Sequence, residues 1–161
     1  MPFTLFHERF KEIGIQETRS ITIPPGGSFG LPAGDYGFFE MFCDEAGCDC
    51  RRVMFYVVSS ARSELEATVS WGWEPAEFYA QWSIDDDPDI GFEIKGPLVD
   101  PLGPQTALGP AICDLVRDVL LRDQAYVERI KRHYAMFRQK IDGKPKRKRV
   151  RRKVRRKRRR K

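Results

Sequence analysis

The distribution of charge along the chain constrains its fold more than any other feature of the sequence. Residues 144–161 contain 15 Lys and Arg residues and no Asp or Glu. Residues 1–143 contain the other 14 Lys and Arg residues and all 23 Asp and Glu residues, so this larger part carries a net charge of −9. A run of like charges repels itself and has no apolar surface to bury. The sequence therefore predicts one acidic domain over residues 1–143, followed by a disordered Lys/Arg-rich tail over residues 144–161.

The acidic part of the chain has the length and the apolar content of a single globular domain. Hydrophobic residues make up 41% of the chain, and only two of them, Val150 and Val154, lie in the tail. A domain of this length buries roughly 68–70% of the surface of its unfolded chain and needs no disulfide to fold. The N-terminal residues lack the pattern of a secretory signal, and no apolar run reaches the roughly 18 residues of a membrane-spanning helix. We therefore expect a cytoplasmic protein, at the nucleoid or the ribosome, with reduced cysteines and no membrane contact.

The middle of the domain has the pattern of antiparallel strands. Residues 36–43 and 50–58 are aromatic and β-branched, and the polar loop 44–49 between them predicts a β-hairpin. A third strand, an N-terminal strand and an edge strand are expected at residues 66–73, 19–23 and 89–95. The third strand alternates apolar with polar residues, which predicts one buried face and one face in solvent.

Apolar residues at helical spacing predict helices at both ends of the domain. A short helix is expected in the first 18 residues, where Phe3, Phe6, Phe10 and Ile13 recur. Residues 112–120 and 126–141 carry the apolar stripes of two amphipathic helices, which we expect to form an α-hairpin. The predicted fold is therefore α+β, with a three- or four-stranded antiparallel sheet and a C-terminal helix pair on one face.

Three of the four cysteines, Cys43, Cys48 and Cys50, cluster around the predicted hairpin turn. Residues that face each other on paired strands have Cβ atoms about 4.5–5.5 Å apart, and Cys43 and Cys50 flank the loop that contains Cys48. The three thiols are therefore expected to meet and to bind zinc, which prefers four tetrahedral ligands. The candidates for a fourth ligand are Cys113, His133, His7 and the loop carboxylates Asp44, Glu45 and Asp49.

Two other interpretations of the cysteines stay open. The positions of Cys43 and Cys50 are also typical of small apolar residues at the ends of buried strands. A nucleophilic thiol is the other interpretation, and it would need a neighbouring His. Arg51 and Arg52 directly follow the last of these cysteines and are expected to offset the negative charge of a thiolate site.

Two sequence motifs resemble those of a known group of proteins. They are LPAGDYG at residues 31–37 and FCDEAGCDCRRV at residues 42–53. On these motifs the chain resembles an uncharacterised group of bacterial proteins that share a cysteine-bearing β-hairpin. The similarity also covers residues 71–79 and the closing helices, roughly residues 31–142 in all. Because the group has no established activity, the resemblance implies a bacterial cytosolic protein but no catalytic residue and no substrate.

The basic tail is the strongest functional signal in the sequence. Its charge density matches that of a polyphosphate, and neutralising phosphates releases condensed counterions, which drives binding without sequence preference. Arg outnumbers Lys in the tail, which favours bidentate phosphate contacts. The residues expected to contact RNA or DNA are Lys146, Arg147, Lys148, Arg149, Arg151, Arg152, Lys153, Arg155, Arg156, Lys157, Arg158, Arg159, Arg160 and Lys161.

These features favour a non-enzymatic protein that associates with nucleic acid through its tail and holds a structural zinc ion at the hairpin cysteines. Two alternatives from other classes stay open. One is a metal- or thiol-dependent enzyme that the tail concentrates on a polyanion; a zinc enzyme would need an open coordination position for water. The other is an adaptor whose acidic domain contacts a basic protein partner.

Overall fold

The computed structural model describes residues 2–84, 87 and 89–143, and it confirms the predicted α+β class. The strands are β1 (Phe3–Leu5), β2 (Arg19–Ile23), β3 (Gly34–Cys43), β4 (Arg52–Ser59), β5 (Glu64–Gly72) and β6 (Leu98–Val99). The helices are α1 (Phe6–Arg9), α2 (Lys11–Glu17), α3 (Ala76–Ala80), α4 (Ile90–Lys95), α5 (Gly109–Asp118), η1 (Leu120–Arg122) and α6 (Gln124–Asp142). The basic tail, for which the sequence predicts disorder, lies outside the described residues.

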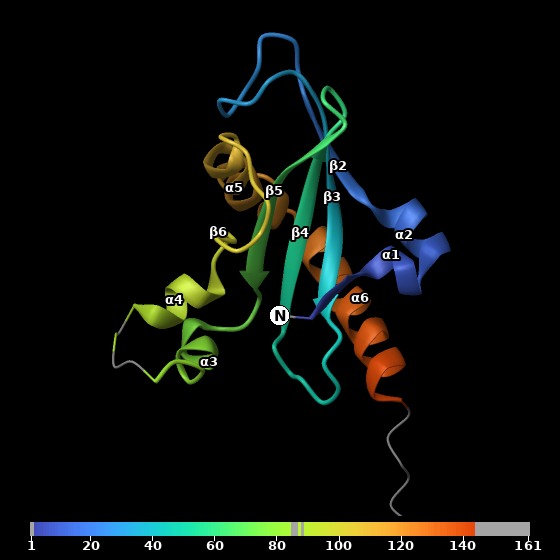
Figure 1. The fold of residues 1–161 in the computed structure, drawn as a ribbon, viewed down its shortest axis with the longest axis vertical. Coiled ribbons are helices and arrows are strands. Elements are labelled where there is room, and N and C mark those ends of the chain that lie inside the picture. Colours follow the sequence, from blue (N-terminus) through green and yellow to red (C-terminus); the bar gives the residue numbers. More distant parts are fainter. Residues whose placement is uncertain (1, 85–86, 88, 144–161) are drawn as a thin grey trace, which may run out of the picture.

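The strands form one antiparallel sheet in the order β1-β3-β4-β5-β6, with β2 also paired to β3 (Figure 1). The predicted hairpin is its centre and consists of β3 and β4. The described chain contributes six strands to it rather than the three or four expected, because β1 and β6 are too short to leave a pattern in the sequence. Strands β1 and β2 pair with successive parts of β3, so α1 and α2 interrupt one edge of the sheet.

Two local predictions near the ends of the sheet are corrected. Residues 89–95, expected as an edge strand, contain the helix α4, because β6 occupies the edge of β5 instead. Gly91 lets α4 pack closely on α3, since a Cβ atom there would lie 2.3 Å from the carbonyl oxygen of Ala76. The N-terminal helix is also shorter than expected: Phe3 belongs to β1, and the helix is divided into α1 and α2 at Phe10.

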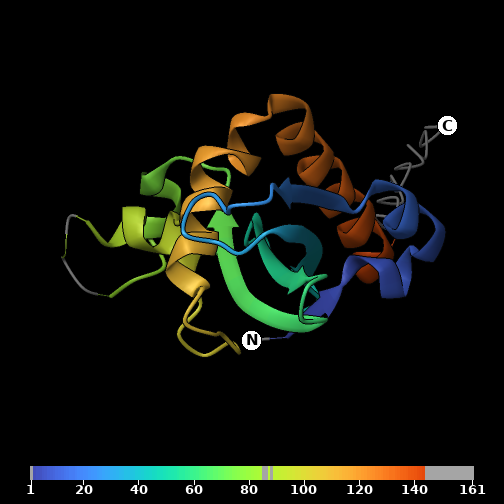
Figure 2. The ribbon, with the colours of Figure 1, turned by 90° about the horizontal axis from the view of Figure 1, so that it is seen from above.

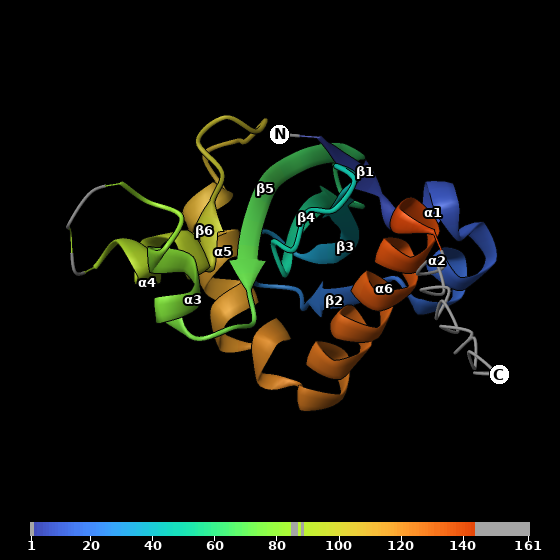
Figure 3. The same ribbon diagram turned by 90° about the horizontal axis from the view of Figure 1, so that it is seen from below.

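The C-terminal helices cover one face of the sheet and form the core with it (Figures 2 and 3). Helix α5 contacts β5 and β6, whereas α6 contacts β3 and α1. The short helix η1 turns the chain between them, so they diverge and do not form the expected hairpin. Aromatic rings fill the space under α6, where Phe42 contacts Tyr134 and Phe137. No helix in the described part of the chain has the length and apolar character needed to cross a membrane.

The opposite face of the sheet is covered where it was expected to meet solvent. Thr68 and Ser70 of β5 are only 1% and 5% exposed. Gly103, in the connection after β6, packs on Thr68, and Arg52 donates to both Ser70 and the backbone carbonyl of Ile94 in α4. The prediction of one wet face for this strand is therefore wrong, because segments distant in sequence cover it.

Candidate metal centre

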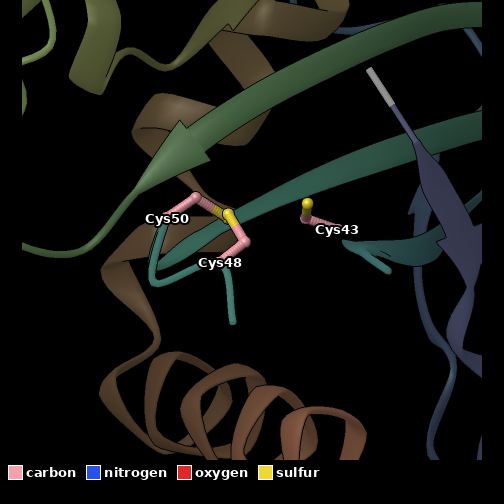
Figure 4. Close-up of side chains that lie close together, drawn as sticks. All are labelled: Cys43, Cys48 and Cys50. Atoms are coloured by element: carbon pink, nitrogen blue, oxygen red, sulfur yellow. The ribbon is translucent and has the colours of Figure 1, made fainter. Parts of the chain in front are cut away.

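The thiols of Cys43, Cys48 and Cys50 meet at the end of the β3–β4 hairpin, as predicted (Figure 4). Their sulfur atoms all lie within 4.8 Å of one another, and none of them is in a disulfide. Cys43 ends β3 and is 4% exposed, while Cys50 precedes β4 and is 9% exposed. Three sulfur atoms this close to each other form a donor set that suits zinc or another thiophilic metal.

The loop between the strands folds back so that Cys48 approaches the other two cysteines. The backbone N–H of Cys48 donates to the carbonyl oxygen of Glu45 at 3.2 Å and closes a turn. Gly47 and Arg51 adopt positive φ angles of 76° and 48°, which reverse the chain on either side of Cys48. A left-handed conformation suits Gly but is unfavourable for Arg, so other contacts must hold the loop in place.

Helix α6 supplies those contacts through Arg138 and Asp142. The Arg138 guanidinium donates to the carbonyl oxygens of Cys43 and Glu45, at 2.8 and 2.9 Å. Asp142 accepts from the backbone N–H of Gly47 at 2.8 Å and pairs with Arg138 at 2.6 Å. The i, i+4 spacing of this pair is visible in the sequence, but nothing there shows that it reaches the hairpin loop. Sequence reasoning therefore missed the residues that position the thiols.

Arg52, two residues after Cys50, is a buried cation. Its side chain is 9% exposed, and no carboxylate in the described chain lies within ion-pair distance of it. Burial lowers the pKa of Arg52, and negative charge on Tyr79, Cys50 and Asp100 would oppose this shift. Arg51, expected to share this role, instead pairs with carboxylates of the surface.

The thiols of Cys43 and Cys50 are poor nucleophiles. Burial, followed by the neighbouring thiols of Cys48 and Cys43, raises the pKa of Cys50 to about 12. Burial also raises the pKa of Cys43. Because the thiolate is the reactive form, the environment of these two cysteines does not favour thiol catalysis.

Most of the expected fourth ligands lie in other contacts. Cys113 of α5 donates to the carbonyl oxygen of Pro97 at 3.3 Å, and the ring of His7 contacts Phe39. His133 contacts Glu40 and Glu17 instead. Among the described residues no His, Cys, Asp or Glu joins the three sulfur atoms. A bound zinc ion would therefore have three protein ligands and one position for a non-protein ligand.

A second polar cluster, which sequence reasoning missed, centres on His133. Its ring is 1% exposed and stacks on Phe6 at 4.2 Å. Nδ1 lies 2.7 Å from Glu40 of β3, and Nε2 lies 2.8 Å from Glu17 of α2. Tyr126 donates its hydroxyl to the other oxygen of Glu40 at 3.0 Å. The cluster therefore ties α2, β3 and α6 together in the core.

The electrostatics of this cluster favour a structural role. Burial opposes ionisation of Glu17, but hydrogen bonds from His133 and Arg132 outweigh it and lower the pKa of Glu17. Burial and then Glu40 raise the pKa of Tyr126 well above its usual range, so its hydroxyl stays a donor. The adjoining cavity has a volume of only about 10 Å³, room for one water molecule and no substrate.

A signal for this cluster was present in the sequence. His133 continues the apolar stripe of α6 after Tyr126 and Ile130, and Glu40 occupies an inward position of β3 between Phe38 and Phe42. A polar residue on a buried stripe must find a partner, so the positions of His133 and Glu40 each indicate a polar contact in the core.

Compared with protein-family models, curated proteins and solved structures, the chain matches none of them. The resemblance to the cysteine-hairpin group therefore stays a prediction.

Proposed function

We propose that the protein binds zinc at Cys43, Cys48 and Cys50 and associates with nucleic acid through residues 144–161. The observation that carries the metal site is the approach of the three sulfur atoms to within 4.8 Å of each other. Charge balance supports it, because zinc with three thiolates carries a net charge of −1 and Arg52 supplies a buried positive charge. The ion would tie the end of β3 to the start of β4.

Metal analysis of the full chain tests this site. Protein purified without a histidine tag under reducing conditions is expected to hold about one equivalent of zinc, and Cys48→Ser and Cys50→Ser should each lose it. Cys113→Ser is the matched control and should keep the metal, since its thiol lies outside the cluster. A chelator should also lower the melting temperature. Less than about a tenth of an equivalent of any transition metal in the unsubstituted protein would contradict the site.

The charge of the tail supports the association with nucleic acid. The tail contains 15 basic residues and no acidic residue, whereas the domain before it is acidic. A polyanion would therefore meet the tail and be repelled by the rest of the chain. Phosphate contacts alone carry no sequence information, so little preference among sequences is expected.

A salt titration tests the tail. If about six of its charges contact phosphates of a duplex, log K should fall against log salt concentration with a slope near −5. Replacing the basic residues 155–160 with Gln should flatten that slope. The control variant Lys11→Gln/Arg122→Gln, at two exposed positions of the domain, should leave it unchanged. A slope that is the same in all three proteins would place nucleic-acid binding outside the tail.

A further inference from the structure

Helices α3 and α4 lie next to each other beside the sheet (Figure 1), and large apolar side chains on and next to them are exposed. Trp82, Ile84 and Phe92 are 42%, 100% and 64% exposed. A groove of about 430 Å³ beside α4 is lined by Ile90, Glu93, Ile94 and Leu98. The name α3–α4 face is used here for the exposed residues of these two helices and their flanks, namely Glu77, Trp82, Ile84, Asp89, Phe92 and Glu93.

The rings of α3 already hold two arginines of the same chain. The Arg51 guanidinium lies 4.9 Å from the ring centroid of Phe78, and that of Arg52 lies 5.6 Å from the ring centroid of Tyr79. Arg51 also pairs with Glu74 at 3.2 Å, so ring and carboxylate act together. Trp82 contacts both rings edge to face, yet no cation in the described chain lies over its own ring.

The charge around Trp82 suits a further cation. The sequence has no Lys or Arg between Arg62 and Lys95. In the part of the chain that the structure describes, Glu77, Asp89 and Glu93 form no ion pair. Some exposed carboxylates elsewhere are paired, such as Asp114 with Arg117, whereas Glu12 and Glu64 form no ion pair in the described chain. The α3–α4 face is therefore a negatively charged surface with an unused aromatic ring.

We propose that the α3–α4 face is the docking site of residues 144–161 of the same chain. The segment supplies what this face lacks, namely Arg and Lys side chains for the Trp82 ring and for the unpaired carboxylates. Its 18 residues span up to about 60 Å when extended, several times the roughly 15 Å radius of gyration of a domain of 143 residues. An intramolecular contact is therefore within reach from Gly143.

The docked segment is held mainly by charge, so salt and polyanions release it. At 0.01 M salt the Debye length is about 30 Å and the attraction is at full strength, whereas at 1 M salt it falls to about 3 Å. The α3–α4 face thus binds residues 144–161 until a polyanion that binds them more tightly displaces it. This contact neither involves the thiols nor requires that the natural polyanion be nucleic acid.

Carbodiimide cross-linking of the full chain tests the docking, because it joins Lys amines to carboxylates that touch them. At about 0.01 M salt, the lysines of residues 144–161 should link to Glu77, Asp89 and Glu93, and these links should vanish at about 1 M salt. In an equal mixture of ¹⁵N-labelled and unlabelled protein, each linked pair should come from one copy. Trp82→Ser should lower the yield about two- to fivefold, from the loss of the cation–π contact. Glu12→Gln, at an exposed position of α2, is the control and should leave the yield unchanged.

Links that go equally to Glu12, Glu64 and Glu128, or that join labelled to unlabelled copies, would overturn the proposal. An unchanged yield in Trp82→Ser would do the same. The readout uses neither metal nor nucleic acid, so failure here is distinct from failure of the proposed function.

Discussion

Replacing Glu40 with Leu is expected to lower the free energy of unfolding by about 1–3 kcal/mol for each buried group that it leaves without a hydrogen-bond partner. The substitution leaves His133 and the Tyr126 hydroxyl without their shared acceptor inside the core. Urea denaturation of the full chain measures the loss. Glu128→Leu is the matched control, because that side chain is 67% exposed and pairs only with Lys131 at the surface. The control should change stability by no more than about 0.5 kcal/mol.

The double variant Glu40→Leu/His133→Leu separates the network from simple packing. Removing both partners leaves fewer unpaired polar groups than removing one, so the two losses should not add. We expect a coupling energy of about 1–3 kcal/mol between the two positions. Strict additivity would show that the contacts of His133 with the carboxylate contribute nothing beyond the volume of the two side chains.

Arg138→Met is expected to weaken zinc binding by about 10- to 100-fold, as changes to groups that orient metal ligands usually do. Without its guanidinium, the carbonyls of Cys43 and Glu45 lose their donor and Asp142 loses its partner. The loop is then free to move the thiols apart. This expectation rests on the proposed metal site.

Competition with a chromogenic chelator measures that change in affinity. Arg117→Met is the matched control, because Arg117 also pairs with an aspartate of its own helix but is 49% exposed and does not touch the hairpin. Its zinc affinity should equal that of the unsubstituted protein. An unchanged affinity in Arg138→Met would show that the thiols keep their positions without the Arg138 guanidinium.

The central part of the fold could be predicted because its periodicity directly reflects burial. Strands β2 and β3 and helices α5 and α6 each bury a face or stripe that repeats at the period of the element. Strands β4 and β5 are buried along most of their length and could be predicted from their β-branched and aromatic residues. Strands β1 and β6 were not predicted because they have only three and two residues, too few to show a period. Helix α4 was misassigned because its packing on α3 depends on Gly91. The sequence alone does not show that a side chain at this position would clash with the backbone of Ala76.

The candidate site was predictable only where its residues are close in sequence. Cys43, Cys48 and Cys50 belong to one hairpin, and hairpin geometry alone brings them together. Arg138 lies 95 residues from Cys43, and no local pattern reports a contact at that separation. The contact of His133 with Glu40 joins residues 93 apart, so the sequence alone could not show that this candidate fourth ligand lies away from the thiols.

The reliance of the hairpin on α6 has a consequence for the order of events during synthesis. The contact between Gly47 and Asp142 joins residues 95 apart, and that between Glu17 and His133 joins residues 116 apart. At about 5–20 residues per second, translation needs roughly 5–20 s to make α6 after the cysteine loop. During that interval the thiols are made but not yet enclosed. The thiols are therefore accessible to oxidants and to metal ions on the nascent chain before the domain is complete.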